Sequence, residues 1–220
     1  MLRLRGVTRT YQDGQPVHAL RAVDLDIAAG DYVTITGPSG SGKTTLLNVL
    51  GLLDTPDSGS YQIGGVETAG AGEAIRTAIR GQVCGFVFQA FHLLPGRTAL
   101  ENVDLAMIYG PHRRPQRRRL AAAALDRVGL SHRLDADPAQ LSGGEKQRVA
   151  IARAVAPHPH IVFADEPTGN LDSANTANVL SLLRQLNDDG LTLVVVTHDA
   201  EVAAAGRRRI RVVDGVVAEC

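Results

Sequence analysis

The sequence predicts an α/β fold built around a mainly parallel sheet, and three observations support this class. Short apolar runs bounded by polar residues recur along the chain, which is typical of strands buried on both faces of a sheet. Segments with helical periodicity follow these runs. A glycine-rich turn joins the first of the runs directly to a helix. Strand, helix and strand at this spacing favour parallel connections.

The predicted elements follow in chain order. The first strand is expected over residues 31–37, and the helix after the glycine-rich turn over residues 43–50. Near the other end of the chain, residues 173–186 place their apolar side chains on one face and are expected to form a helix. The other strands of the sheet are predicted over residues 85–89, 160–167 and 191–199.

Between residues 90 and 157 the pattern changes. Strand-like runs are absent there, and residues 98–109 and 117–130 have the pattern of helices. A chain of 220 residues is long enough for one domain with a substantial core. We therefore expect one domain over residues 1–220, with a core of residues 1–89 and 158–220 and an inserted helical subdomain of residues 90–157.

Composition limits the classes of partner. Lys and Arg together number 23, as do Asp and Glu, so the formal net charge is zero and nucleic acid is not an expected partner. Two distant cysteines suit a reducing compartment. The first residues show no signal-peptide pattern, and no run approaches the about 20 apolar residues of a membrane span. We expect a soluble chain whose role at a membrane depends on a partner.

Residues 37–44, GPSGSGKT, match the phosphate-loop pattern G-x-x-x-x-G-K-[ST] between a predicted strand and a predicted helix. Glycines let backbone N–H groups close around phosphates, and the helix N-terminus adds its positive end. We expect Lys43 to reach the β and γ phosphate oxygens and Thr44 to offer its hydroxyl to Mg²⁺. The predicted nucleotide-binding residues of the loop are Gly37, Ser39, Gly40, Ser41, Gly42, Lys43, Thr44 and Thr45.

Two adjacent carboxylates, Asp165 and Glu166, come at the end of a predicted strand. Phosphoryl transfer needs a metal ligand and a group that orients or deprotonates water. Because neighbouring strand side chains point to opposite faces, a strand end suits a division of labour, with Asp165 toward Mg²⁺ and Glu166 toward the water. Without the phosphate loop, two solvated acids would be the better interpretation. His198 ends the next strand, where functional and structural interpretations are equally open.

Ser142 and Glu145 form the S-x-x-E pattern of a capping box, and the simple interpretation is that Ser142 caps its own helix. A cap does not need Gly143 and Gly144 at the first helical positions, where glycine costs up to about 1 kcal/mol relative to alanine. Bare backbone at a helix start suits an approaching anion. Since the first phosphate site is already lined on its own side, we infer that this helix start faces a γ-phosphate held by another copy of the chain.

The chain resembles the ATP-binding-cassette (ABC) ATPases over essentially its whole length. The motifs GPSGSGKTT, LSGGEKQR, IVFADEP, GNLD and VVVTHD occur in the order seen in that family. The resemblance implies a RecA-like phosphate-loop NTPase core, an N-terminal antiparallel β part and an inserted α-helical subdomain. It also implies ATP and Mg²⁺ as ligands, and a pair of cassettes that sandwiches two ATP molecules head to tail.

The resemblance further implies roles for single residues. Tyr11 matches the aromatic residue that stacks on adenine, and Gln89 matches the glutamine that approaches Mg²⁺ and the attacking water. Glu166 matches the catalytic base, and His198 matches the histidine that contacts the γ-phosphate. The implied sets are Glu166, His198 and Gln89 for catalysis, Thr44, Gln89 and Asp165 for the metal, Tyr11, Ser142, Gly143 and Gly144 for the nucleotide, and Asn170 and Asp172 for the link between the two sites of the dimer.

Within the family, the stretches NVLGLLDTPDSGSY, GFVFQAFHLLPGRTALENV and ADEPTGNLDS are similar to the lipoprotein-release and macrolide-exporter group. This similarity implies a cytoplasmic motor, peripheral at the inner face of the membrane, that powers export or extraction through a separate permease. The alternative is an ATPase that moves a membrane partner to activate a cell-wall enzyme without transport. A third class is the soluble cassette ATPases of DNA repair or translation. Those are longer chains with coiled-coil or zinc-binding insertions, or with two cassettes in tandem, and this sequence shows neither feature. We interpret the arginine-rich residues 112–119 as a solvated helix face, with anionic lipid or a partner as alternatives.

Overall fold

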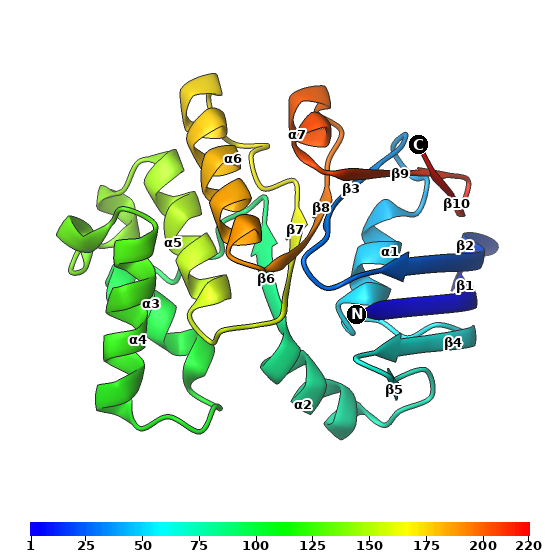
Figure 1. Cartoon of the computed structure of the whole chain (residues 1–220), viewed down its shortest axis with the longest axis horizontal. Helices are drawn as coiled ribbons and strands as arrows, with labels where there is room; N and C mark the ends of the chain where they lie inside the picture. The colour runs from blue at the N-terminus through cyan, green and yellow to red at the C-terminus, as the bar shows by residue number, and fades with distance from the viewer.

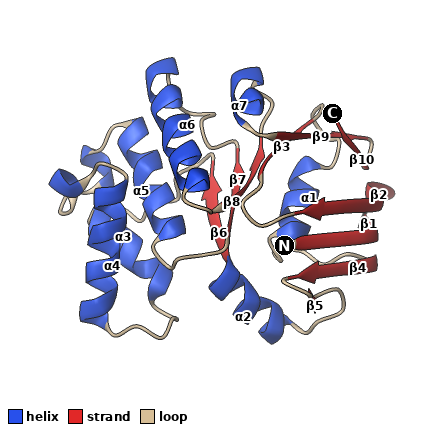
Figure 2. Ribbon diagram, in the orientation of Figure 1, coloured by secondary structure: helices blue, strands red, loops and turns tan.

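The computed structural model describes the backbone of residues 1–220 and every side chain except that of Asp13. Figure 1 shows an antiparallel sheet around the N-terminus, a central sheet, and a group of helices beyond it, and Figure 2 distinguishes strands from helices. The strands are β1 (Leu2–Asp13), β2 (Gln15–Ile27), β3 (Tyr32–Thr36), β4 (Ser58–Ile63), β5 (Val66–Glu67), β6 (Cys84–Phe88), β7 (Ile161–Asp165), β8 (Thr192–Val196), β9 (Arg208–Val213) and β10 (Val216–Glu219). The α-helices are α1 (Lys43–Leu50), α2 (Glu73–Val83), α3 (Ala99–Asp104), α4 (Arg114–Arg127), α5 (Gly143–Val155), α6 (Ser173–Asp188) and α7 (Ala200–Ala205).

The central sheet has the strand order β10-β9-β3-β8-β7-β6. Strands β9, β3, β8, β7 and β6 run parallel, and β10 pairs antiparallel with β9. Every residue of β8 is buried, as its continuous apolar run predicts for a strand covered on both faces. The predicted α/β class is confirmed. The predicted strands correspond to β3, β6, β7 and β8, with ends that differ by at most three residues.

The N-terminal sheet has the order β2-β1-β4-β5 and is antiparallel. Its apolar side chains share one buried cluster with α1 and with one face of the central sheet, including Leu4, Leu47 and Ile35. The backbone N–H of Arg21 in β2 donates to the carbonyl of Gly215, between β9 and β10, at 2.9 Å. Helix α1 contacts both sheets. The strand–loop–helix unit β3–α1 is therefore held firmly between them.

The opposite face of the central sheet is covered by α5, α6 and α7, and α3 and α4 pack on α5. One apolar cluster joins these helices to the sheet, with Leu125, Val149 and Val195 fully buried. The helical character predicted for residues 90–157 is confirmed, since α3, α4 and α5 lie there with no strand between them in this fully described stretch of backbone. The division into a core and a subdomain at residues 89 and 157 stays a prediction.

Several elements differ from the expectations. The helix expected over residues 98–109 is α3 followed by a 3₁₀ turn at Leu105–Met107. Helix α4 begins at Arg114, three residues earlier than expected, because Pro115 has the backbone angle that suits a first turn.

Helix α2 was not predicted. Its apolar residues Ile75, Ile79 and Val83 recur every four positions, which is a helical signal that the sequence analysis missed. Ile79 and Val83 pack, partly buried, against the apolar cluster that includes α1.

Across the side chains and backbone that the structure describes, no helix is both long enough and apolar enough to cross a membrane.

Candidate functional site: a nucleotide site at the carboxyl edge of the parallel sheet

The phosphate loop connects β3 to α1 in a conformation that only glycine allows at several positions. Gly37, Gly40 and Gly42 have φ values of 151°, 76° and 104°, where side chains are strained. A Cβ atom on Gly37 would lie 2.1 Å from the carbonyl oxygen of Val212, and one on Gly42 would lie 2.2 Å from that of Ala19. The loop is thus pressed between β9 and β2. This close packing holds its backbone in one shape before any ligand binds.

Lys43 lies across the loop. Its Nζ donates to the carbonyl oxygens of Gly37, at 2.9 Å, and Pro38, at 2.8 Å. Among the described side chains no carboxylate forms a direct ion pair with Lys43, although Asp165 is near enough for the two charges to interact. Ser41 is buried, and its Oγ has no hydrogen-bond partner among the described residues. A free cation and an unpaired buried hydroxyl in one loop fit an oxyanion ligand such as a phosphate.

The other hydroxyl groups of the loop lie at its open end. Ser39 and Thr44 are exposed, as is the backbone of Gly40 between them, and Thr45 is partly exposed. These groups are therefore accessible to a ligand that enters from solvent. The structure brings together the predicted residues of the loop as the sequence pattern requires.

Asp165 is the last residue of β7 and is partly buried. Burial, and then the negative charge of Glu166, raise the pKa of Asp165, whereas the positive charge of Lys43 lowers it. The carboxylate therefore lies near Lys43 in surroundings that lack enough positive charge to stabilise its ionised form. Such a site fits a bound Mg²⁺, which prefers carboxylate and hydroxyl oxygen ligands.

Glu166 has left the strand conformation, with φ at 48°. Its Oε1 accepts a hydrogen bond from the backbone N–H of His198 at 3.0 Å and lies 2.7 Å from His198 Nδ1. Its Oε2 accepts from Thr197 Oγ1 at 3.2 Å. Because a carboxylate only accepts, Nδ1 carries the proton in this contact. The ends of β7 and β8 thus orient Glu166, and Thr197 is a contributor that the sequence analysis missed, although it stands beside His198 in the motif VVVTHD.

Gln89 follows β6 and lies against the loop after β7. The backbone carbonyl of Gln89 accepts a hydrogen bond from Asn170 Nδ2 at 2.9 Å. A Cβ atom on Gly169 would lie 2.7 Å from Gln89 Nε2, so the Gln89 side chain packs directly on this glycine and would have to move for a larger residue. The tertiary structure therefore brings Gln89 to the segment that also carries Glu166.

Ser142 forms the predicted capping box at the start of α5. Ser142 Oγ accepts from the backbone N–H of Glu145 at 3.2 Å, and Glu145 Oε2 accepts from the backbone N–H of Ser142 at 2.8 Å. That second bond is the largest factor that lowers the pKa of Glu145. A Cβ atom on Gly144 would lie 2.0 Å from Asn175 Oδ1, whereas one on Gly143 meets nothing closer than 3.6 Å. Gly144 is thus required by packing within the chain. Gly143 is the glycine that leaves backbone free for an approaching anion.

The structure does not bring this glycine pair to the phosphate loop. Figure 1 places α5 and α1 on opposite sides of the central sheet. Their buried side chains belong to separate apolar clusters. A ligand held by the loop of one chain therefore cannot reach Ser142 of the same chain.

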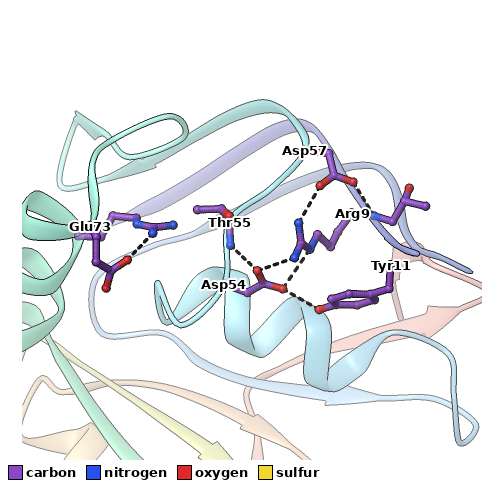
Figure 3. A network of polar contacts seen from close by, with 8 residues as sticks. Arg9, Tyr11, Asp54, Thr55, Asp57 and Glu73 are labelled. Carbon is purple, nitrogen blue, oxygen red and sulfur yellow. Dashed lines mark hydrogen bonds and ion pairs between the residues drawn. The ribbon is translucent and has the colours of Figure 1, made fainter. Parts of the chain in front are cut away.

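Tyr11 is part of a polar network on β1, shown in Figure 3. Its hydroxyl donates to Asp54 Oδ2 at 2.7 Å. The guanidinium carbon of Arg9 lies 4.8 Å from the centroid of the Tyr11 ring. Arg9 and Asp54 were not singled out from the sequence, because they carry no motif and become neighbours of Tyr11 only in the folded chain.

Parallel strands bring the phosphate loop, the two carboxylates and His198 to one edge of the sheet, outside the carboxyl ends of β3, β7 and β8. This fold and this loop define the class of the protein as a phosphate-loop nucleoside triphosphatase.

Comparison with known proteins specifies the family. The family described as "ABC transporter" matches residues 20–169. A macrolide export ATP-binding/permease protein MacB from Rhodopirellula baltica is 49% identical, over 100% of this chain and 33% of the relative. An ABC transporter ATP-binding protein, YvrO from Bacillus subtilis, is 44% identical, over 98% of this chain and 94% of the relative. A solved dimeric, post-hydrolysis structure of the ATP-binding cassette MJ0796 with ADP and Pi superposes with a TM-score of 0.90 at 45% identity, covering 100% of this chain and 98% of that one.

The chain belongs to the ABC transporter family, and it is one of the ATP-binding, ATPase cassettes of that family. It spans about a third of the length of the MacB relatives that it matches.

Proposed function

We propose that this chain hydrolyses ATP as a head-to-tail pair and thereby drives a membrane transporter of the export type. The observation that carries the proposal is the division of the site across the sheet. The phosphate loop, Glu166 and His198 lie at one edge, and the Ser142 helix start lies on the other side. A second copy, turned around, supplies the Ser142 wall that each loop lacks. The solved dimers of a similar cassette support this arrangement.

Each residue has a part in this proposal. Lys43 and the loop N–H groups bind the β and γ phosphates. Asp165, Thr44 and Gln89 would hold Mg²⁺, which when bound would neutralise charge on the phosphate oxygens. Glu166 accepts a proton from the attacking water, and the bonds from Thr197 and His198 hold its carboxylate in one orientation. The exposed His198 ring is then available for contact with the γ-phosphate.

The test is ATP-dependent dimerisation. In Glu166→Gln, loss of the general base should slow hydrolysis by about 10²–10⁴-fold, and the variant should elute as a dimer in ATP on size exclusion. Adding Ser142→Arg should return it to a monomer that still binds ATP. Thr98→Arg is the matched control, because Thr98 makes the same capping box at α3. A Glu166→Gln protein that stays monomeric in ATP, or a dimer that tolerates Ser142→Arg, would contradict the proposal.

A groove supports the proposal of a membrane partner. A cavity of about 1000 Å³ lies between α2, β6 and the end of α5. Phe86, Phe88 and Tyr109 line it, and Tyr109 is fully exposed. Two partly buried phenylalanines and one exposed tyrosine around a groove suit an inserted helix with an apolar face. We assign this groove to a cytoplasmic segment of the permease, which would hold the cassette at the inner face of the membrane.

The relatives support a permease of the exporter type. The MacB relatives are named as ATP-binding/permease proteins, and YvrO is named as an ATP-binding protein of nearly the same length as this chain. We propose a separate permease chain here. A partner that is moved by the cassette without transport would use the same groove, and co-purification followed by identification of the bound protein distinguishes the two.

A further inference from the structure

We propose that Asp54 and Arg9 are positioning residues that hold the Tyr11 ring as the platform for the nucleotide base and tie it to the phosphate-binding helix. This inference rests on the base-stacking role of Tyr11 in the proposed function. Asp54 and Arg9 belong to none of the three parts of the site described above, which are the phosphate loop, the pair Asp165 and Glu166, and the turn at Ser142. The inference assigns a role to these two residues.

Asp54 is the centre of the network in Figure 3. Its Oδ2 accepts hydrogen bonds from Tyr11 Oη at 2.7 Å and from Arg9 Nε at 3.0 Å. Its Oδ1 accepts from the backbone N–H of Thr55 at 2.7 Å and lies 2.8 Å from Arg9 Nη2. Both oxygens therefore have fixed partners, and the Tyr11 hydroxyl binds to a carboxylate that cannot turn away. Charge-assisted bonds of this kind are stronger than neutral ones.

Arg9 constrains the same ring from one face. Its guanidinium lies over the ring at 4.8 Å, a cation–π arrangement. Its Nη1 donates to Asp57 Oδ1 at 2.8 Å, and Asp57 Oδ2 accepts from the backbone N–H of Thr10 at 2.6 Å. The hydroxyl contact fixes the tip of the ring, and the guanidinium fixes its plane. Tyr11 stays partly exposed, so a base can stack on the face opposite Arg9.

The network also connects the ring to the phosphate loop. Asp54 follows α1, whose first residue is Lys43, and α1 is a rigid rod of roughly 12 Å. A second connection runs through the sheet. Thr10, the residue before Tyr11 in β1, pairs with His18 of β2, and the carbonyl of the next residue, Ala19, packs on Gly42 of the loop. The base platform and the phosphate loop are thus parts of one rigid unit. Binding of a ligand that contacts both therefore costs less side-chain entropy than it would if the ring were mobile.

The test compares a ligand with a base and one without. In Asp54→Asn the charge that holds both Arg9 and Tyr11 is lost, and ATP binding should weaken about tenfold. Binding of inorganic tripolyphosphate, which needs only the loop, should change less than twofold. Tyr11→Phe keeps the ring and loses the hydroxyl, so it should weaken ATP in the same selective way. The dissociation constants are measured by titration calorimetry in Mg²⁺, with Tm recorded for every variant.

Asp26→Asn is the matched control, because it removes a carboxylate that pairs with Arg3 and Arg5 in the same sheet without touching Arg9 or Tyr11. It should leave ATP binding within twofold. Equal weakening of ATP and tripolyphosphate in Asp54→Asn, or no weakening of ATP, would overturn the inference. Tyr11→Ala separates the two proposals. If it weakens ATP while Asp54→Asn and Tyr11→Phe do not, only the positioning role fails. If Tyr11→Ala has no effect, the base-stacking role fails, and the positioning role fails with it.

Discussion

At the scale of single residues, Asp165 combines function with a cost to the fold. Burial and the charge of Glu166 raise its pKa above the ordinary Asp value. A raised pKa in the folded state means that ionised Asp165 destabilises the protein. Protonated Asp165 carries no such penalty. The folded protein is therefore most stable, with respect to this group, below the unfolded-state pKa, and it loses that stability as the pH rises through the folded-state pKa. Burial and Glu166 thus leave the ionised form of Asp165 poorly compensated, as a cation site requires.

Asp165→Asn should accordingly raise the Tm of the nucleotide-free protein at pH 7, because the amide cannot ionise. The gain should shrink as the pH falls and vanish below about pH 4, where Asp165 is protonated in both states. Scanning calorimetry of both proteins between pH 4 and pH 7 measures this. The same variant should lose Mg²⁺-dependent hydrolysis.

Asp172→Asn is the control of opposite sign. The backbone N–H of Asn175 is the largest factor that lowers the pKa of Asp172. Ionised Asp172 therefore stabilises the fold above its unfolded-state pKa, and this stabilisation is lost as the pH falls through the folded-state pKa. Its amide should lower Tm slightly at pH 7. If the change in Tm caused by Asp165→Asn did not depend on pH, Asp165 would not be a carboxylate whose ionised form destabilises the fold.

At the scale of elements, the start of α5 separates packing from ligand access. Gly143→Ala has room for its methyl group, so it should stabilise the helix by up to about 1 kcal/mol. It also covers backbone that faces the neighbouring nucleotide in the proposed dimer. ATP hydrolysis should fall at least tenfold while Tm stays the same or rises. Steady-state kinetics together with Tm measures this opposition.

Gly144→Ala should behave differently, since its methyl group meets the Asn175 side chain. Asn175 Nδ2 is held by Asp172 Oδ2 at 2.8 Å, so the side chain cannot move freely. Overpacking of this kind costs about 1–3 kcal/mol. Asn175→Ala should restore much of the lost stability. If both glycine variants lower Tm equally, the distinction drawn between them is wrong.

The elements that the sequence predicted well have strong local patterns. Helix α1 spans the predicted residues 43–50, and β8 is apolar in every residue after Thr192. The N-terminal strands were not predicted one by one. Register shifts interrupt β1 at three places, so its buried and exposed side chains do not alternate regularly. In β2 the first four residues are exposed, and strict alternation of exposed and buried residues begins only at Ala22. Irregular alternation removes the period on which a strand prediction depends.

At the scale of the whole molecule, the groove beside β6 is the surface that we assign to the permease. Tyr109 is fully exposed there, so Tyr109→Ala should leave Tm and the ATPase rate of the isolated cassette unchanged. Permease binding should weaken roughly tenfold or more, as for an aromatic anchor at an interface. Val216→Ala, an exposed apolar residue on β10 away from the groove, is the control. Equal effects of the two changes on permease-stimulated ATPase activity would argue against the groove.

The arginine-rich stretch lies beside this groove. Arg117 pairs with Asp104 at 3.1 Å, and Arg113, Arg114, Arg118 and Arg119 are exposed. The expectation of a solvated helix face agrees with this exposure.

The sequence by itself determined the family, the phosphate loop, the capping box and the strand-end carboxylates. Each motif consists of residues that are close together in the chain, so it can be recognised without the fold, and the order of the motifs along the chain gives the carboxylates and the capping box their functional interpretation. Only the tertiary structure decided that Thr197 orients Glu166, that Asn175 requires Gly144, and that Asp54 holds Tyr11. These contacts join residues 31 or more positions apart, which are brought together by a strand order that does not follow the order of the chain. The same order places the Ser142 turn out of reach of its own phosphate loop, because the central sheet stands between them.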